Sequence, residues 1–385
     1  MSDRVDSGAE SGRGRRLGEF AAVFLKLGTI AFGGPAAHIA MMEDEFVRRR
    51  AWLSRQDFLD LVGAASLIPG PSSTEVAIYV GYRRAGWRGL LIAGICFILP
   101  AALMVTALAW AYVQLGHLPQ VGAVLYGVKA MVIAIIAQAL VGLARTAFKT
   151  KTLAALGVIA VSACLFGVNP LGVLIGTGLA SGILRGLARP DRRRPVAFLL
   201  GAGGVAGTSS LIVPVTLTKL FLVFLKIGAV VFGSGYVLLA FLRADFVEGT
   251  RWLTEARLLD AVAIGQVTPG PVFTTATFIG YLLAGLPGAA VATVAIFLPS
   301  FLLVAGSGPL IPRIRNSSMA AAVLDGVNAG AVAVILVVGL QLGRTALVDG
   351  TTIALAAAGF AALVVFRLNS AWLVLAGAFV GWWRV

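Results

Sequence analysis

Residues 24–34 of the chain read FLKLGTIAFGG, and residues 224–234 read FLKIGAVVFGS. The offset of 200 positions continues to two Pro-Gly-Pro motifs, at 69–71 and 269–271. It becomes 199 between Gly81 and Gly280 and stays so at Pro100 and Pro299. Matches in register over this distance are the signature of an internal repeat. The sequence therefore predicts a tandem duplication of a unit of about 150 residues.

The composition indicates a membrane protein. Of the 385 residues, 59% are hydrophobic and 12% are charged, and the mean hydropathy is +0.94. Soluble domains carry about 25% charged residues, so an ordinary soluble enzyme is excluded. At about 20 apolar residues per crossing, the chain has room for about ten to fourteen spans. We predict an all-α polytopic membrane protein.

The charged residues say little about soluble ligands. The net charge is +14, but the basic residues stand mostly in short gaps between apolar runs, where they set orientation and contact anionic lipids. No basic stretch interleaved with aromatic residues predicts nucleic-acid binding. Cys96 and Cys164 each lie in an apolar run, and His38 and His117 are the only histidines. Neither a metal site nor another cofactor is expected.

The basic loops exchange sides between the two halves. The loop with Arg83, Arg84 and Arg88 corresponds to residues 284–288, which contain no basic residue. Residues 116–120 also contain none, whereas their counterpart carries Arg313 and Arg315. Because cytoplasmic loops are enriched in Lys and Arg, this alternation predicts two halves in inverted topology.

The division of the chain follows from these patterns. We expect a disordered basic tail at 1–19 on the cytoplasmic side, a first repeat at 20–150 and linker transmembrane helices at 151–217. A second repeat at 218–350 and C-terminal transmembrane helices at 351–385 complete the prediction.

Each Pro-Gly-Pro motif interrupts an apolar segment, at 59–82 and 259–281. Two prolines around a glycine remove two backbone donors and stop a helix, so paired discontinuous or re-entrant helical hairpins are predicted. Helices that restart after such a break present free N–H groups and a positive dipole end, which suits an anion. The alternative is that the breaks are kinks needed only for packing. The predicted anion donors at these breaks and at the two glycine breaks are Gly33, Gly34, Gly70, Ser72, Ser73, Thr74, Gly233, Ser234, Gly270, Thr274 and Thr275.

Ionisable residues inside apolar segments are candidates for function, because burying them in lipid is costly. Lys26 and Lys226 match across the repeat, so a pseudo-two-fold axis could bring both cations to one cavity and neutralise a dianion. The alternative is that both snorkel to the interface. Lys129, whose counterpart is Asn328, is a weaker candidate.

Acids and a histidine supply proton-coupling candidates. Glu75 follows the first Pro-Gly-Pro motif and has no acidic counterpart at Thr274 or Thr275. A low-dielectric cavity favours its neutral form, as proton coupling requires, although Glu75 could instead stabilise a helix N-terminus. His38 could relay protons or be structural. The matched acids Asp60 and Asp260 are expected to cap helices or pair with arginines rather than bind substrate.

These motifs resemble a known family. The stretches FLKLGTIAFGGPAAHIAMM, SLIPGPSSTE and GYRRAGWRG in the first half, with FLKIGAVVFG and QVTPGP in the second, look like the chromate ion transporter family in its two-domain form. The resemblance covers nearly the whole chain after the tail. It implies a carrier of the plasma (inner) membrane that exports chromate, confers chromate resistance, depends on the membrane potential or a proton gradient and is antagonised by sulfate.

Two alternatives accompany this reading. The same tetrahedral dianion chemistry fits uptake of sulfate or a related anion. A membrane enzyme would need a cluster of acids, histidines or metal ligands, and none is evident in the sequence. Short relatives of duplicated carriers can pair as antiparallel dimers, so a homodimer stays open as well, although the fused chain could work alone.

Overall fold

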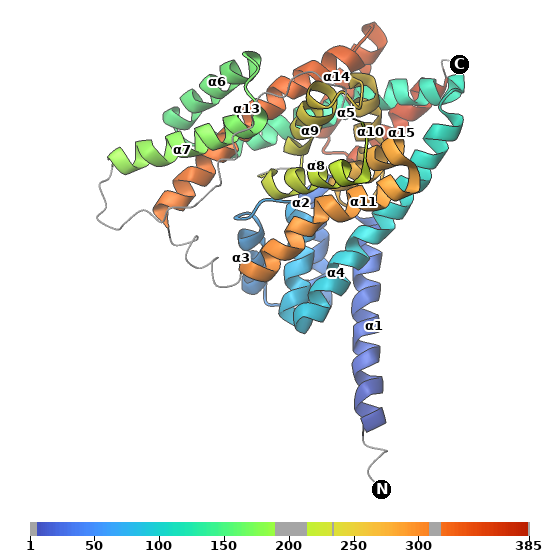
Figure 1. Ribbon diagram of the computed structural model, residues 1–385, viewed down its shortest axis with the longest axis vertical. Helices are drawn as coiled ribbons and strands as arrows, with labels where there is room; N and C mark the ends of the chain where they lie inside the picture. Colours follow the sequence, from blue (N-terminus) through green and yellow to red (C-terminus); the bar gives the residue numbers. More distant parts are fainter. Residues whose placement is uncertain (1–5, 189–213, 233–234, 308–316, 384–385) are drawn as a thin grey trace.

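The computed structural model describes residues 6–188, 214–232, 235–307 and 317–383, and in these ranges it contains helices and no strands (Figure 1). The predicted site residues Gly233 and Ser234 and the glycine-rich part of the linker, 189–213, lie outside the described residues. Two series of helices follow the same order along the chain. The first is α1 (Asp6–Ile30), α2 (Gly34–Glu43), the π-helical η1 (Asp44–Arg49), α3 (Arg55–Ala65), α4 (Ser72–Leu115), α5 (Pro119–Ala147), α6 (Lys151–Leu165) and α7 (Pro170–Ala188). The second is α8 (Leu217–Val230), α9 (Val237–Leu242), the π-helical η2 (Arg243–Gly249), α10 (Glu255–Val267), the 3₁₀-helical η3 (Val272–Thr274), α11 (Thr275–Ser307), α13 (Ser318–Ala346), α14 (Gly350–Val364) and α15 (Ser370–Trp382).

The start of the chain differs from the prediction of a disordered tail at 1–19. Helix α1 begins at Asp6, so most of that segment is helical (Figure 1). No proline interrupts residues 6–30. Helix growth is cooperative, so the buried turns around Phe20 and Phe24 can support further turns towards the N-terminus.

The predicted breaks are present in both halves. Helix α3 ends at Ala65 and α4 begins at Ser72, while α10 ends at Val267 and α11 begins at Thr275 after the short η3. Each segment therefore stops at its Pro-Gly-Pro motif, as the loss of two backbone donors requires. The prediction of paired discontinuous helices is confirmed.

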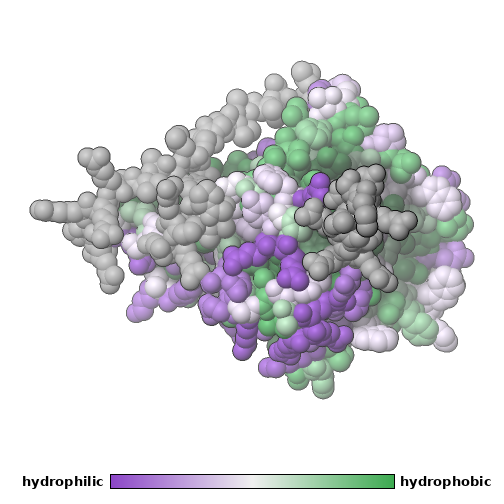
Figure 2. Space-filling model, turned by 90° about the horizontal axis from the view of Figure 1, so that it is seen from below, coloured by the Kyte–Doolittle hydropathy of each residue, from purple (hydrophilic) through white to green (hydrophobic). Residues whose placement is uncertain are grey.

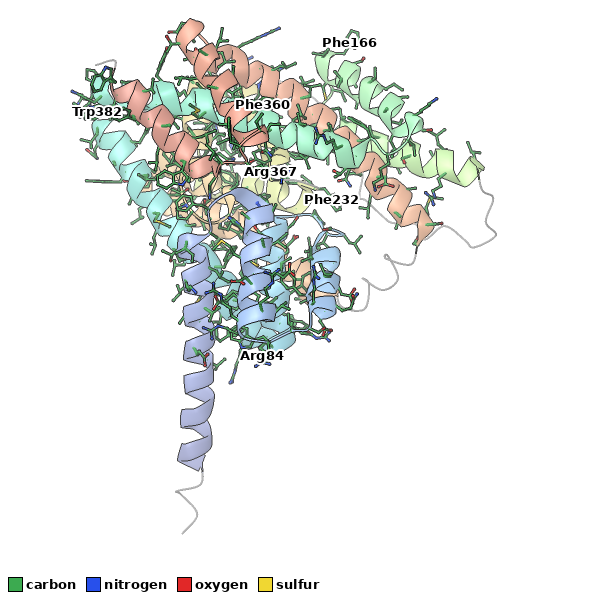
Figure 3. All side chains as sticks on the ribbon, turned by 180° about the vertical axis from the view of Figure 1, so that it is seen from behind. Arg84, Phe166, Phe232, Phe360, Arg367 and Trp382 are labelled. Atoms are coloured by element: carbon green, nitrogen blue, oxygen red, sulfur yellow. The ribbon has the colours of Figure 1, made fainter. Side chains whose placement is uncertain are left out.

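A second bend folds α4 into a hairpin. Ala85 and Gly86 leave the helical conformation, and Gly86 has φ +58°, which only glycine adopts without strain. The two arms then touch through their backbones: a Cβ added to Gly81 would lie 2.3 Å from the carbonyl oxygen of Gly89. Helix α11 repeats this geometry at Ala284 and Gly285, with Gly280 against Gly288. Arg84 lies at the turn end of the α4 hairpin, whereas Phe166 and Trp382 lie at the other end of the molecule (Figure 3).

The two halves are intertwined. Helix α4 packs against α11, and the long helices α5 and α13 pack against each other. Helix α13 also packs against α6 and α7 of the first half, and α5 packs against α14 and α15 of the second half. Asn169 caps α7 and Asn369 caps α15 in the same way, each accepting from the N–H two residues on. We infer that the repeat continues through the segments predicted as linker and C-terminal helices.

The outer surface suits a bilayer. Five described helices are long and apolar enough to cross a membrane: α4, α5, α7, η3 with α11, and α13. Large apolar side chains face outward from them, among them Leu103 at 61% exposure and Leu302 at 62%. Seen from the end where α1 begins, polar residues gather in one region beside apolar surface (Figure 2). The chain is a multi-pass, all-α membrane protein built of two related halves.

The glycine contact inside the α4 hairpin gives a first test. Gly81→Ala should lower the melting temperature of the detergent-solubilised protein, because the new methyl group meets backbone that cannot rotate away. Overpacking of this kind costs about 1–3 kcal/mol. The control is Gly122→Ala, because a Cβ at this exposed position on α5 meets no atom within 4 Å. Equal melting temperatures for the two variants would contradict the close contact between the arms.

Candidate functional site

The broken helices of the two halves meet through two crossed backbone hydrogen bonds. The N–H of Gly70 donates to the carbonyl of Val231 at 2.8 Å, and the N–H of Gly270 donates to the carbonyl of Ala31 at 2.8 Å. Ala31 and Val231 are themselves equivalent positions of the repeat. Each Pro-Gly-Pro break is thus tied to the glycine break of the other half. The two glycine N–H groups, predicted to bind the anion, are already used, because buried backbone donors need a partner.

Glycine is required at these crossing points. Gly70 has φ +138° and Gly270 has φ +101°, both in the region that L side chains rarely adopt. Space also excludes a side chain: a Cβ on Gly270 would lie 2.5 Å from the Cβ of Ala101. Gly33 and Gly34 have φ +103° and +78° and start α2, so their conformation shapes the first glycine break.

His38 and Ser73 come together beside the crossing. Nε2 of His38 lies 2.9 Å from the carbonyl oxygen of Ala31, and Nδ1 lies 3.2 Å from Oγ of Ser73. A carbonyl only accepts, so Nε2 carries the proton, and in the neutral ring Ser73 donates to Nδ1. Both side chains are buried. The structure thus joins two residues that the sequence assigned to separate breaks.

Glu75 is buried next to Gly70. Its side chain is inaccessible to solvent, and no described residue meets hydrogen-bond geometry with either carboxylate oxygen. The hydroxyl of Ser300, from α11, faces the same glycine: a Cβ built on Gly70 would lie 2.2 Å from Oε1 of Glu75 and 2.7 Å from Oγ of Ser300. At the equivalent place in the second half, Gly270 faces the methyl group of Ala101. The buried acid and its facing hydroxyl, one from each half, therefore occur at only one of the two crossings among the described residues.

The hydroxyl groups after the breaks have different roles. Thr274 and Thr275 donate to the carbonyls of Pro271 and Val272, each at 2.8 Å, so they stabilise the η3 turn. This corrects the prediction that they are free to bind an anion, since local carbonyls compete for short polar side chains. The hydroxyl of Thr74 is buried without a hydrogen-bond partner among the described residues, and Ser72 lines a cavity.

Lys26 and Lys226 form separate ion pairs within their own halves. Nζ of Lys26 lies 3.1 Å from Glu45, and Nζ of Lys226 lies 2.5 Å from Asp245. The two acids are equivalent positions on the π-helical turns η1 and η2. The structure therefore does not bring the two cations to one cavity as predicted. The offset of 200 also matches Glu45 with Asp245, which is the one signal in the sequence that pointed to these acids.

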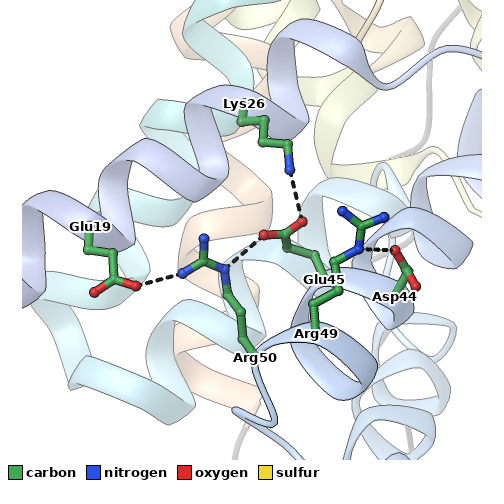
Figure 4. A network of polar contacts seen from close by, with 6 residues as sticks. All are labelled: Glu19, Lys26, Asp44, Glu45, Arg49 and Arg50. Carbon is green, nitrogen blue, oxygen red and sulfur yellow. Dashed lines mark hydrogen bonds and ion pairs between the residues drawn. The ribbon is translucent and has the colours of Figure 1, made fainter.

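The Lys26 pair belongs to a larger network (Figure 4). Arg50 donates through Nε to Glu45 at 2.8 Å and through Nη1 to Glu19 at 2.6 Å. The hydrogen bond from Arg50, helped by Lys26, holds the pKa of Glu45 below its usual range. In the second half, burial raises the pKa of Asp245, and Lys226 opposes that change. The network connects α1 to the turn that follows α2.

A polar cavity of about 260 Å³ lies at the start of α4. Its walls come from the first Pro-Gly-Pro break, the C-terminal end of α5 and the middle of α13, so both halves contribute. Its polar lining residues are Ser66, Ser72, Thr146, Lys149 and Asn328. A neighbouring cavity of about 390 Å³ shares Ser66 and Asn328 with it and lies between α3 and α13.

The cavity offers the groups that an oxyanion needs. Ser72 lines the cavity at the start of α4, its N–H group has no partner among the described residues, and the helix dipole favours negative charge there. Lys149 adds a cation at the mouth, where its ammonium contacts Asp325 at 2.8 Å and its side chain is 59% exposed. Ser66 and Thr146 also line the cavity, but their hydroxyl groups donate to the carbonyls of Val62 and Leu143 in their own helices, which leaves Ser72 as the hydroxyl donor. A single anion can therefore meet a helix N-terminus, a hydroxyl, an amide and an ammonium group.

Sequence reasoning did not select Ser66, Thr146, Lys149 or Asn328. A weak signal was present, since Thr146 matches Thr345 across the repeat and Asn328 is the counterpart of Lys129. Only the packing of α13 against α5 brings these residues to the break in α4. Among the described residues, no group of three or more histidines, cysteines or acids could hold a metal ion.

Comparison with known proteins gives a consistent result. The family model described as "Chromate transporter" matches residues 18–183 and again residues 218–382. A "Chromate transport protein" of Cupriavidus metallidurans is 36% identical over 365 residues, which is 92% of this chain and 90% of the relative. A "Chromate transport protein" of Pseudomonas aeruginosa is 32% identical over 381 residues, 93% of this chain and 90% of the relative. A "Probable chromate transport protein" of Synechococcus elongatus is 35% identical over 337 residues, 85% and 84% of the two chains. No solved structure matches.

The Glu45 network predicts a pH-dependent contribution to stability. Because the folded-state pKa of Glu45 is lowered, its charge stabilises the folded protein above the usual carboxyl pKa, and this contribution is lost as the pH falls through the folded-state value. Glu45→Gln should therefore melt about 1–3 °C lower than the parent at pH 7. The difference should close below about pH 4. The control is Asp44→Asn, whose acid is half-exposed. A gap that persists unchanged to low pH would contradict the assignment.

Proposed function

Because the chain belongs to the chromate transporter family, we propose that it carries chromate across the plasma (inner) membrane by alternating access. Members of this family are transporters and not enzymes. The observation that carries the proposal is the cavity at the N-terminus of α4, which collects Ser72, Lys149 and Asn328 around one space. Chromate is a tetrahedral dianion with four acceptor oxygens, and convergent N–H, hydroxyl and ammonium donors match it.

The binding step exchanges one ion pair for another. Lys149 now contacts Asp325, and we propose that an incoming dianion takes the place of this carboxylate. The start of α4 then holds the inner oxygens through its free N–H groups. Because the Asp325 carboxylate competes for Lys149, the site does not bind an anion too tightly. A carrier needs this limit in order to release the ion that it transports.

Glu75 couples the site to protons. It lies on α4, three residues after Ser72, so its carboxylate and a bound dianion repel each other through a low-dielectric interior. The anion therefore binds more tightly when Glu75 is protonated, and a proton and an anion should move together. Export of the remaining negative charge is favoured by a membrane potential that is negative inside. Ser300 faces the acid, and His38 with Ser73 lies beside the crossing as a proton path.

Orientation and assembly complete the proposal. The alternation of basic loops supports an inverted pair of halves with the N-terminus on the cytoplasmic side and basic loops against anionic lipids. The fused chain holds both halves, so a homodimer is not required for a complete unit. Sulfate has the same shape and charge as chromate, and uptake of sulfate or a related anion is the alternative.

Chromate uptake into inverted membrane vesicles tests the site. Lys149→Ala should weaken apparent chromate affinity by about 10- to 100-fold, because a charge-assisted contact is worth about 1.5–3 kcal/mol. Lys151→Ala is the matched control, since this lysine is exposed at the start of α6 and does not line the cavity. Sulfate in the same assay should compete. Unchanged affinity in Lys149→Ala would remove the cavity from the proposal, and transport of sulfate without chromate would overturn the substrate.

Variation of the pH in the same vesicles tests the coupling. In the parent, apparent chromate affinity should rise as the pH falls, by about tenfold over the full titration, because protonation removes a like charge. In Glu75→Gln the affinity should stay at its low-pH value throughout. Asp44→Asn, which changes a half-exposed acid, should keep the parental profile. A parental profile in Glu75→Gln would contradict proton coupling through this residue.

A further inference from the structure

The two halves differ in how a short broken helix meets the long helix of the other half. Helix α10 packs directly against α5. The equivalent helices α3 and α13 are separated by the cavity of about 390 Å³. Leu59, on α3, is 48% exposed, whereas its counterpart Leu259, on α10, is fully buried. One crevice of the pseudo-symmetric pair is therefore open, and the other is closed.

A buried polar cluster fills the closed crevice. Nζ of Lys129, on α5, lies 2.6 Å from Oδ1 of Asp260, on α10. The hydroxyl of Tyr112, at the end of α4, donates to Oδ2 of the same carboxylate at 2.8 Å. Asp260 is 6% exposed, and the ring of Phe278 packs edge-on against Tyr112. One carboxylate thus takes an ammonium and a phenol donor in an apolar surround.

In the other half, the positions equivalent to Asp260 and Lys129 line the open cavity. The counterpart of Asp260 is Asp60 and that of Lys129 is Asn328, and both line the open cavity. Asn328 also lines the cavity at the start of α4. The position occupied by Lys129 is therefore, by the symmetry of the repeat, a position that faces the anion pathway.

We propose that Lys129 and Tyr112 form a second anion site, which takes the same tetrahedral dianions and which the Asp260 carboxylate occupies while the crevice is closed. This inference rests on the proposed function and deepens it. The donors that hold the Asp260 oxygens are the kind of donors that hold an oxyanion. In an inverted repeat, exchanging the conformations of the two halves opens the closed crevice to the opposite side of the membrane. The bound dianion then replaces Asp260 on Lys129 as α10 moves away from α5.

The chemistry explains why an ion pair stands here rather than apolar packing. A buried ion pair contributes little net stability, because the cost of desolvating the two charges offsets most of their attraction. It closes the crevice reversibly, and once broken it leaves a cation that needs a new anion. An apolar contact would close the crevice but provide nothing for the cargo to bind.

Cysteine accessibility in the full-length protein, reconstituted in liposomes, tests this inference. In a background with Cys96→Ala and Cys164→Ala, a single cysteine is placed at Ser66 in the open cavity or at its counterpart Gln266. A membrane-impermeant maleimide should modify the Ser66→Cys protein rapidly and the Gln266→Cys protein slowly. Asp260→Asn should speed modification at 266 by about tenfold or more, since a shift of 1.4 kcal/mol in the opening equilibrium gives that factor.

Chromate protection separates opening from binding. With Asp260→Asn, Lys129 remains, so chromate should slow modification at 266. With both Lys129→Asn and Asp260→Asn, the crevice should open but chromate should protect at least about tenfold less well, as expected for loss of a charge-assisted contact. The double variant removes both charges, so it leaves no unpaired buried ion and guards against misfolding of the single variant.

The results separate the second anion site, closure of the crevice by Asp260 and the proposed function. Equal protection in the single and double variants would overturn the second site, and no change of rate at 266 in either would overturn closure by Asp260. Protection of the Ser66→Cys protein by chromate tests the proposed function separately. Failure at 266 with protection at 66 removes this inference alone, whereas failure at 66 removes chromate binding in the open cavity.

Discussion

The whole arrangement depends on two hydrogen bonds that cross between the halves, from Gly70 to Val231 and from Gly270 to Ala31. A helix that breaks inside a membrane leaves backbone groups that neither water nor lipid can satisfy, at a cost of several kcal/mol each. Here each break supplies the missing partner of the other. In each of these bonds the donor comes from one half and the acceptor from the other, so the packing of the halves satisfies both breaks. The last helices of each half also pack on the other half. Helices α6 and α7 pack against α13, and helices α14 and α15 pack against α5.

On this symmetric frame a few substitutions make the halves chemically different. Gly70 faces a carboxyl and a hydroxyl group, from Glu75 and Ser300, whereas Gly270 faces the methyl group of Ala101. The buried acid therefore has no equivalent in the other half. Lys129 and Asn328 differ in the same way, with the cation in the closed crevice and the amide in the open one. Duplication provides two equivalent crevices, and divergence gives them different charged residues.

Much of this frame was predictable, for a local reason. The Pro-Gly-Pro motifs remove backbone donors wherever they stand, so the ends of α3 and α10 follow from sequence alone. The repeat showed that the breaks are paired, and the apolar composition required helices in a membrane. His38 and Ser73 were both chosen from their places at the breaks, although their mutual contact was not foreseen. The domain bounds stay predictions; where a disordered tail at 1–19 was expected, the structure draws α1 from Asp6.

The sequence by itself determined that the chain lies in a membrane, that it is an internal repeat and where its helices stop, because these features depend on residue type and spacing. Only the tertiary structure decided which polar groups are available. In the folded protein the N–H groups of Gly70 and Gly270 donate to carbonyls of the other half. Lys26 and Lys226 form ion pairs with Glu45 and Asp245. The tertiary structure also brought Lys149 and Asn328, 179 positions apart in the sequence, to the start of α4. A donor is free for a ligand only when no nearer acceptor satisfies it, and that depends on which helices pack together.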